Sequence, residues 1–255
     1  MIRRGARTLY RLLLPLGLLA LAACGAGEPP ADAGRGLEPG DDQAALAPED
    51  GAATAGLDEI QEAPTSERFQ LGVHYQRLSP TQPTSSSPDQ VEVAEVFWYG
   101  CPHCYAFEPY LESWAEQKPA YVSFVRIPAL WNPTLRLHAR AFYTAQALGK
   151  LDEMHSAFFT EIHENRNPLA TREALAEFFG RFGVDADEFA ETFDSYDGVH
   201  EQMQRAEELN LRYQISSVPT VVVNGKYTTN ATLAGTYEQL IELINELAAS
   251  ERPGN

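Results

Sequence analysis

The sequence predicts an α/β domain that is interrupted by a helical segment, and three stretches of the chain support this prediction. A strand, a helix and a second strand follow one another between residues 91 and 127. Four helices and a shorter fifth then fill residues 135–211 without an intervening strand. A β-hairpin and a final helix occupy residues 220–249. Because a strand–helix–strand order is typical of a parallel sheet unit, the helices between it and the hairpin are predicted to be an insertion.

The first unit is defined by an apolar run and the residues that follow it. Residues 91–99 are rich in β-branched and aromatic side chains, which favours a largely buried strand. Gly100 then permits a turn, and Pro102 occupies the first position of a helix, where proline is favoured. Amphipathic spacing continues the helix through 108–114, and residues 121–127 alternate as a second strand.

The remaining elements follow from the spacing of apolar residues. Spacings of three and four predict helices over 135–148, 151–162, 171–182 and 196–211, with a shorter helix over 187–193. Residues 220–223 are predicted to form a strand, Asn224-Gly225 its hairpin turn, and 226–228 the partner strand. A final amphipathic helix covers 237–249, and residues 69–73, ahead of the first strand, are predicted to form a short extended piece.

Composition sets limits on the partners of the chain. The 255 residues carry a formal charge of −17 at pH 7, which argues against nucleic acid or anionic lipid as a binding partner. Apolar residues make up 44% of the chain, enough for a proper core. Most of the chain is therefore expected to be globular.

The N-terminus has the pattern of an export signal. Four arginines precede an apolar stretch, residues 12–23, that is too short to span a bilayer. The stretch ends in Leu21-Ala22-Ala23-Cys24, which resembles the lipobox of bacterial lipoproteins. That resemblance implies a lipoprotein signal peptide over 1–23, cleavage before Cys24, and lipidation of the Cys24 thiol. The alternative is an ordinary secretory signal peptide cut at the small residues.

The next segment is predicted to be a disordered acidic tether over 24–66. Alanine, glycine, proline and acidic residues dominate it, and aromatic side chains are nearly absent. Residues 25–68 contain eleven acidic residues against two arginines, Arg35 and Arg68. Such a composition cannot bury enough apolar surface to fold. The sequence leaves open whether the tether gives reach from a membrane or has no specific role.

Two cysteines at the predicted helix start are the main candidates for chemistry. Cys101 and Cys104 are separated by two residues, a spacing that suits either a small disulfide ring or a shared metal ion. At a helix N-terminus, unpaired N–H groups and the positive end of the helix dipole stabilise a thiolate. With Cys24 assigned to lipid, this pair contains the only remaining cysteines. In an exported chain, such a pair favours an active dithiol.

Two motifs at opposite ends of the helical segment give the chain a family resemblance. They are Cys101-Pro102-His103-Cys104 and Val218-Pro219-Thr220. Over residues 91–249 the chain resembles the DsbA family of thiol:disulfide interchange proteins, which have a thioredoxin fold with a helical insertion. The resemblance implies a thioredoxin-like domain over 67–132 and 212–255, with an all-helical insertion domain over 133–211.

The resemblance also implies roles for the residues of these motifs. Cys101 would be the reactive thiol, Cys104 its buried resolving partner, and His103 a group that stabilises the Cys101 thiolate. Pro219 would adopt the cis form and face the disulfide, a minority state for an X–Pro bond. Val218 would present its backbone to an extended substrate, and Pro102 would also contact it.

Glu95 is a carboxyl group inside an otherwise apolar strand, where an unpaired charge is costly. It lies six residues before Cys101, where the family carries an acidic residue beneath the active site. The resemblance implies a catalytic role in proton traffic at Cys104, with Arg126 nearby. The alternative is that Glu95 points to solvent on an exposed strand face beside Glu92.

The function implied is that of an oxidase that donates the Cys101–Cys104 disulfide to reduced exported polypeptides during their oxidative folding. No metal or organic cofactor is expected. A membrane quinone-linked oxidase of the DsbB type would regenerate the disulfide. The protein is expected to be a monomer in the periplasm, anchored to a membrane through Cys24. The sequence leaves open which of the two membranes holds the anchor.

Three alternatives remain open at this stage. A reductase or an isomerase could use the same fold, with a different reduction potential. A metal-binding lipoprotein would need ligands beyond the cysteine pair, since a closed tetrahedral site takes four. The candidates for these ligands are scattered histidines, His138, His155, His163 and His200. A non-catalytic lipoprotein that only docks partners would keep its role without Cys101.

Overall fold

β2 (Val91–Phe97) is the strand that joins the parallel and the antiparallel parts of the sheet. All seven of its residues are buried. It pairs in parallel with β3 (Val122–Pro128) and antiparallel with β4 (Thr220–Val223). β5 (Tyr227–Thr229) and the short β1 (Gln76–Arg77) complete a five-stranded sheet in the order β1-β5-β4-β2-β3.

The computed structural model describes residues 68–254, which belong to one compact unit, Gly56–Asn255. The signal peptide over 1–23, the lipidation of Cys24 and the tether over 24–66 lie outside the described residues and remain predictions. Within 68–254, no helix is long and apolar enough to cross a membrane.

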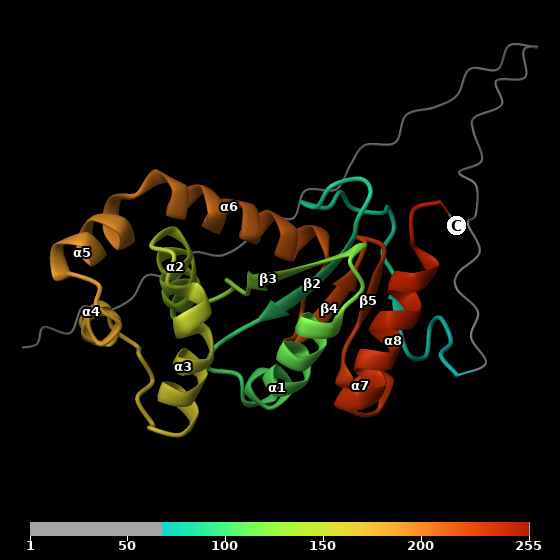
Figure 1. Cartoon of the computed structure of the whole chain (residues 1–255), viewed down its shortest axis with the longest axis horizontal. Coiled ribbons are helices and arrows are strands. Elements are labelled where there is room, and N and C mark those ends of the chain that lie inside the picture. The colour runs from blue at the N-terminus through green and yellow to red at the C-terminus, as the bar shows by residue number, and fades with distance from the viewer. Residues whose placement is uncertain (1–67, 255) are drawn as a thin grey trace, which may run out of the picture. The chain divides into compact units, whose positions relative to one another are not determined.

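Two helices cover one face of the sheet. α1 (Pro102–Gln117) and α8 (Tyr237–Ser250) contact each other, and α8 also contacts β2 and β4. Figure 1 shows both helices along the sheet, with the short α7 (Ala231–Ala234) leading into α8. Val93 and Val223 from the sheet share an apolar cluster with Leu111 of α1 and Leu243 of α8. This cluster holds α1 in place and so positions its N-terminus.

The predicted helical insertion lies between β3 and β4. Its helices are α2 (Pro133–Ala147), α3 (Leu151–His163), α4 (Arg172–Gly180), α5 (Ala186–Ser195) and α6 (Asp197–Arg212). Figure 1 shows α2 to α5 gathered to one side of the sheet, while α6 runs from α5 back toward the sheet. The insertion shares one apolar cluster with Val96 and Phe97 of β2. Phe97 packs edge-on against Phe142 of α2, which joins the insertion to the strand.

The predicted hairpin is present, and its turn has the chemistry that the sequence indicates. Asn224 and Gly225 have φ angles of 52° and 62°, the left-handed pair that a tight two-residue hairpin turn requires. A Cβ on Gly225 would also lie 2.1 Å from the carbonyl oxygen of Gln82. Only glycine therefore fits this position without a shift of the backbone.

The structure differs from the predicted secondary structure in two places, before the first strand and before the last helix. Residues 69–73, predicted as a short extended piece, form a turn in which the Gly72 N–H donates to the Tyr75 carbonyl. Gly72 has a φ of 84°, which interrupts an extended chain, so the edge strand β1 begins only at Gln76. The short helix α7 had no counterpart in the prediction, because four residues are too few to show a helical period.

Candidate active site

The sheet brings the two sequence motifs together. Thr220 at the start of β4 pairs with Val96 near the end of β2, so the residues before β4 lie beside the residues after β2. The Val218–Pro219 peptide bond is cis, as the resemblance implies. The Cys101 Sγ lies 3.5 Å from the Val218 carbonyl oxygen. The cysteine pair and the proline motif therefore form one site, although more than a hundred residues separate them in the sequence.

Cys101 stands at the N-cap of α1, and Pro102 occupies the first helical turn. Its pKa is lowered to about 6, chiefly because the Cys104 thiol donates a hydrogen bond to it. The backbone N–H groups of Cys104 and His103 and the charge of the His103 imidazole lower it further, while burial opposes them. Cys101 retains 7% of its surface exposed, and the His103 side chain is exposed. The structure thus favours a Cys101 thiolate at neutral pH.

Cys104 has the opposite environment. It is fully buried, and its pKa is raised well above the ordinary range, first by burial and then by its hydrogen bond to Cys101. The Cys101 thiolate raises it further, as does the charge that Glu95 carries when it ionises. Both cysteines are free thiols in the structure, which therefore shows the reduced site. In this state Cys104 holds its proton while Cys101 gives its proton up.

Glu95 is completely buried, so the alternative that it faces solvent is wrong. Burial and the nearby charge of Glu108 raise its pKa to about 8, although Arg126 acts in the other direction. Arg126 is its register partner on β3, and the Arg126 Nε lies 3.6 Å from Glu95 Oε2. Neither carboxyl oxygen of Glu95 has a hydrogen-bond partner within residues 68–254. Glu95 is therefore mostly protonated at neutral pH.

Two further buried residues, Glu108 and His155, belong to this site, and sequence analysis gave neither a role in it. Glu108 lies on the face of α1 that Cys104 occupies, one helical turn later, and its side chain is 5% exposed. Its carboxylate pairs with the Arg126 guanidinium, and its Oε1 lies 3.3 Å from His155 Nε2. Burial raises the Glu108 pKa, but these two partners outweigh it and lower the pKa overall. Glu108 follows Cys104 by four residues, a spacing that places both on one face of a helix, and this was the sequence pattern that could have identified it.

A small cleft of about 110 Å³ lies beside the active-site turn. His103, Val218, Pro219 and Tyr237 are among the residues that line it. The Tyr237 hydroxyl donates to the His103 carbonyl at 3.2 Å, which ties the start of α8 to the active-site turn. The predicted substrate-contacting residue Val218 is half-buried, whereas Pro102 is exposed. The cleft is large enough for one side chain of a substrate.

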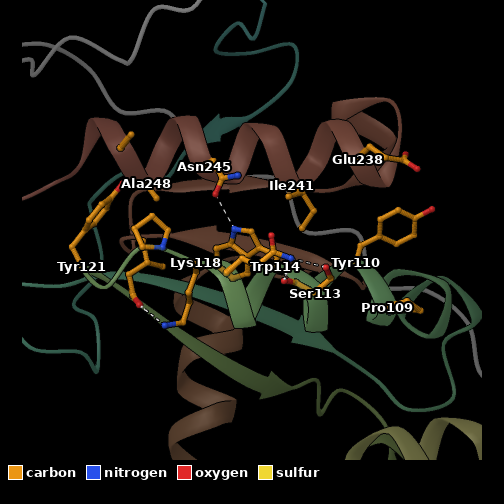
Figure 2. Close-up of a pocket in the computed structure, with 14 residues that line it drawn as sticks. Pro109, Tyr110, Ser113, Trp114, Lys118, Tyr121, Glu238, Ile241, Asn245 and Ala248 are labelled. Atoms are coloured by element: carbon orange, nitrogen blue, oxygen red, sulfur yellow. Dashed lines mark hydrogen bonds between the residues drawn. The ribbon is translucent and has the colours of Figure 1, made fainter.

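A larger cavity lies elsewhere. Figure 2 shows it between the C-terminal half of α1 and α8, with a volume of about 880 Å³. Trp114 forms part of its wall and donates its indole N–H to Asn245 Oδ1 at 2.8 Å. Trp114 is ten residues beyond Cys104, about 15 Å along a helix. This cavity therefore takes no direct part in cysteine chemistry.

Residues 68–254 contain no group of three or more histidine, cysteine or acidic side chains arranged to hold a metal ion. Three of the histidines that were considered as ligands have other partners. His138 Nδ1 accepts from the Trp98 indole, His155 Nδ1 meets the Tyr99 hydroxyl at 2.9 Å, and His163 Nε2 meets the Tyr99 carbonyl. The structure places none of them beside the cysteine pair as a ligand.

Comparison with known proteins identifies the family. The DSBA-like thioredoxin domain matches residues 122–242. A thiol:disulfide interchange protein DsbA from Pseudomonas aeruginosa is 41% identical over 190 residues, covering 74% of this chain and 89% of the relative. The DsbA of Azotobacter vinelandii is 41% identical over 184 residues, covering 72% of this chain and 85% of that protein. The chain belongs to the DsbA family.

Solved DsbA structures agree with this assignment. The crystal structure of Pseudomonas aeruginosa DsbA has a TM-score of 0.68 and 42% identity, covering 72% of this chain and 95% of that one. The DsbA oxidoreductase of Xylella fastidiosa has a TM-score of 0.66 and 30% identity, covering 70% and 95%. The predicted fold class, a thioredoxin-like fold interrupted by helices, is confirmed. This DsbA-family chain is a thiol:disulfide oxidoreductase.

The acidity of Cys101 can be measured in the reduced protein. We expect the ultraviolet absorbance of its thiolate to appear with a midpoint near pH 6. In Cys104→Ala the midpoint should rise, because the hydrogen bond from the Cys104 thiol is lost. Cys104→Ser is the matched control, since its hydroxyl still donates, and its midpoint should stay closer to the wild-type value. A wild-type midpoint above neutral pH would contradict this description.

The raised pKa of Glu95 has a consequence for stability. Its value of about 8 exceeds the value of roughly 4.3 in an unfolded chain, so the folded state binds more protons between these limits. The free energy of unfolding should therefore fall as pH rises from about 4 to about 8. Glu95→Gln removes this titration, so we expect its stability relative to wild type to increase over that range, by more than about 1 kcal/mol.

Chemical denaturation at several pH values measures this effect. Glu92→Gln, on the opposite face of β2, is the matched control. The Glu92 carboxylate accepts hydrogen bonds from Ser85 and Ser86, so this variant should be less stable than wild type at neutral pH. A Glu95→Gln variant whose stability relative to wild type is constant with pH would contradict the raised pKa.

Proposed function

We propose that this protein is an oxidase that donates its Cys101–Cys104 disulfide to reduced, exported polypeptides during oxidative folding. The observation that supports it best is the asymmetry of the two thiols. Cys101 keeps 7% of its surface exposed and has a pKa of about 6, whereas Cys104 is fully buried with a raised pKa. Stabilising the Cys101 thiolate stabilises the reduced protein, which makes the disulfide a stronger oxidant. DsbA proteins are the reference case for such a potential.

The reaction proceeds in two exchanges. A substrate thiolate attacks the Cys101 Sγ, the Cys101–Cys104 bond breaks, and Cys104 leaves with the electron pair and takes up a proton. A second substrate thiolate then attacks the substrate sulfur of the mixed disulfide, and Cys101 leaves as a thiolate. The substrate has lost two electrons, which the cysteine pair now holds. Because its pKa is low, Cys101 is a good leaving group in the second exchange.

Substrate would be held in extended form beside Cys101. In this proposal the Val218 backbone pairs with the substrate chain: its carbonyl oxygen lies 3.5 Å from the Cys101 Sγ, and the next residue, Pro219, has no N–H to donate. Pro102 and His103 are exposed at the start of α1, directly after Cys101 in the sequence. These four residues form the substrate-binding surface in this proposal.

The enzyme needs a second protein to regenerate its disulfide. We assign this role to a membrane quinone-linked oxidase of the DsbB type, which accepts the two electrons from the dithiol. The protein itself would act as a monomer without a metal or organic cofactor, since the cysteine pair is the whole redox centre. Attachment of Cys24 to lipid would hold the enzyme in the periplasm close to a membrane-bound partner.

A reductase or isomerase is the competing function for the same fold, and the reduction potential separates it from an oxidase. We expect the potential of the Cys101–Cys104 pair to be far less reducing than that of thioredoxin, roughly −270 mV. Equilibration with glutathione buffers measures it. Cys104→Ala should accumulate mixed disulfides through Cys101 with exported proteins, whereas Cys101→Ser should trap none. A potential as low as that of thioredoxin would exclude the oxidase.

The lipid anchor has a separate test. Membrane fractions of cells that express the full chain should contain the wild-type protein, and Cys24→Ser should move it to the soluble periplasmic fraction. Mass spectrometry of the mature N-terminus should find an acylated cysteine at position 24 only in the wild type. A soluble wild-type protein with an unmodified N-terminus would show that the signal is an ordinary secretory peptide.

A further inference from the structure

A mostly apolar cavity of about 880 Å³ lies between the C-terminal half of α1 and α8 (Figure 2). Tyr110 and Trp114 of α1 and Ile241 of α8 are among the residues that line it. Sites that bind a small molecule or the side chains of a partner have volumes of roughly 300–1,000 Å³. Because apolar surface in contact with water is unfavourable, apolar side chains of an occupant would gain stability by burial in this cavity.

The first described residues of the chain lie against the helix that forms one wall of this cavity. The Arg68 guanidinium pairs with Glu242 of α8, and Phe69 packs in the apolar cluster that α8 shares with the sheet. Glu242 directly follows Ile241 and lies one helical turn before Asn245, and both of these residues line the cavity. The chain that precedes Arg68 is therefore joined to the domain beside the cavity.

The sequence shortly before Arg68 contains one pair of large apolar residues. Leu57 and Ile60 are the only leucine, isoleucine, valine, methionine or aromatic residues between positions 47 and 67. Their spacing of three places both side chains on one face of a helical turn, and Asp58 and Glu59 lie between them. Short amphipathic helices bind to apolar grooves through side chains with this spacing.

The stretch between this apolar pair and the domain is long enough to reach the whole cavity. Residues 61–67 separate Ile60 from Arg68, and when extended this stretch spans at most about 28 Å. α8, with its 14 residues, is about 21 Å long. A linker this short also gives the pair an effective concentration on the order of millimolar at the cavity. A free partner would have to exceed this concentration to compete.

The charges around the cavity favour an acidic occupant at one of its ends. Figure 2 shows Lys118 and Tyr121 at this end and Glu238 at the other. The Lys118 Nζ donates to the Val122 carbonyl at 2.9 Å, which keeps the ammonium at the cavity wall. The Arg252 guanidinium lies over the Tyr121 ring, 5.1 Å from its centroid. Two positive charges are therefore within reach of an acidic segment docked here.

We propose that the segment Leu57-Asp58-Glu59-Ile60 of this chain docks in the α1–α8 cavity. Its two apolar side chains pack against Trp114 and Ile241, and its two carboxylates face Lys118. The tether then leaves the domain from the α1–α8 side, and its free part comprises residues 24–56. This inference does not depend on the oxidase function, because it concerns a surface away from the cysteines.

Zero-length cross-linking tests the docking, because a carbodiimide joins a lysine to a carboxylate only where the two are in contact. The full mature chain is used in its soluble Cys24→Ser form at micromolar concentration, and mass spectrometry locates the links in the monomer. We expect Lys118 to be joined to Asp58 or Glu59. Lys150, an exposed-region lysine at the start of α3, is the internal reference for random collisions with the tether. Its links to these carboxylates should be rare.

Variants of the tether show whether the apolar pair holds the segment in place. The double variant Leu57→Ser and Ile60→Ser keeps both carboxylates and the whole cavity, and it should lower the yield of the Lys118 link at least about tenfold. The matched control is Leu37→Ser with Leu46→Ser, which removes two leucines from an earlier part of the tether. It should keep the yield of the parent chain.

A change in the cavity wall should have the same effect from the other side. Ile241→Ser removes an apolar contact of the segment and should also lower the yield of the Lys118 link. Thermal unfolding followed by circular dichroism shows whether this variant is folded. The tether variants leave every cavity residue unchanged, so they decide the question even if Ile241→Ser is unstable.

Three outcomes would overturn the docking of this segment. One is a Lys118 link whose yield is the same in the Leu57→Ser and Ile60→Ser chain. Another is a Lys118 link found only in cross-linked dimers, which would identify a second copy as the occupant. The third is loss of the link when a reduced, unfolded polypeptide is added at micromolar concentration, which would identify a substrate. The oxidase function is tested separately by the reduction potential, and its failure would leave the cross-link unchanged.

Discussion

Because β4 runs antiparallel to β2, the loop that precedes β4 lies beside the helix that follows β2, and the site depends on this pairing. Val96 and Thr220 are register partners, so the Val218 carbonyl reaches the Cys101 sulfur. Neither motif has a complete environment alone. The cysteine pair needs an exposed backbone edge that orients a substrate, and that edge needs a reactive sulfur. The apolar cluster under α1 fixes the distance between them.

A second constraint is that the start of α1 stabilises a negative charge on Cys101 and destabilises one on Cys104. The N-terminus of the helix places N–H groups around Cys101, whereas Cys104 is buried and Glu95 acts on it electrostatically. Negative charge is therefore favourable at one sulfur and unfavourable at the other. Burial and the charge of Glu108 keep Glu95 from ionising beside it, while the single Arg126 guanidinium contacts both carboxyl groups and favours the charge on Glu108. The local arrangement of these charges makes the two thiols chemically distinct.

The sequence was sufficient to predict the order of the main elements and the residues of the two motifs. Strands 91–97 and 220–223 are rich in valine, the cysteine motif follows the first, and the proline motif leads into the second. Both strands and both motifs can therefore be recognised from the sequence alone. The burial of Glu95 was undecided, because alternation along β2 does not reveal which face a helix covers. Glu108 and His155 were missed as site residues, since the contact between α1 and α3 exists only after the insertion has packed against β2. The short α7 was also beyond sequence reasoning, because its four residues contain too little periodicity.

The position of the insertion between β3 and β4 has a consequence for the order in which the chain can fold. A chain that emerges from its N-terminus presents α1 with both cysteines long before β4 and α8 are available. Pairing of β2 with β4 is a contact of high sequence separation, so it forms late. Until then the cysteine pair has no neighbouring Val218 and no covering α8. The enzyme is thus assembled by its last forty residues, and a truncated or stalled chain carries thiols that lack the surroundings that control them.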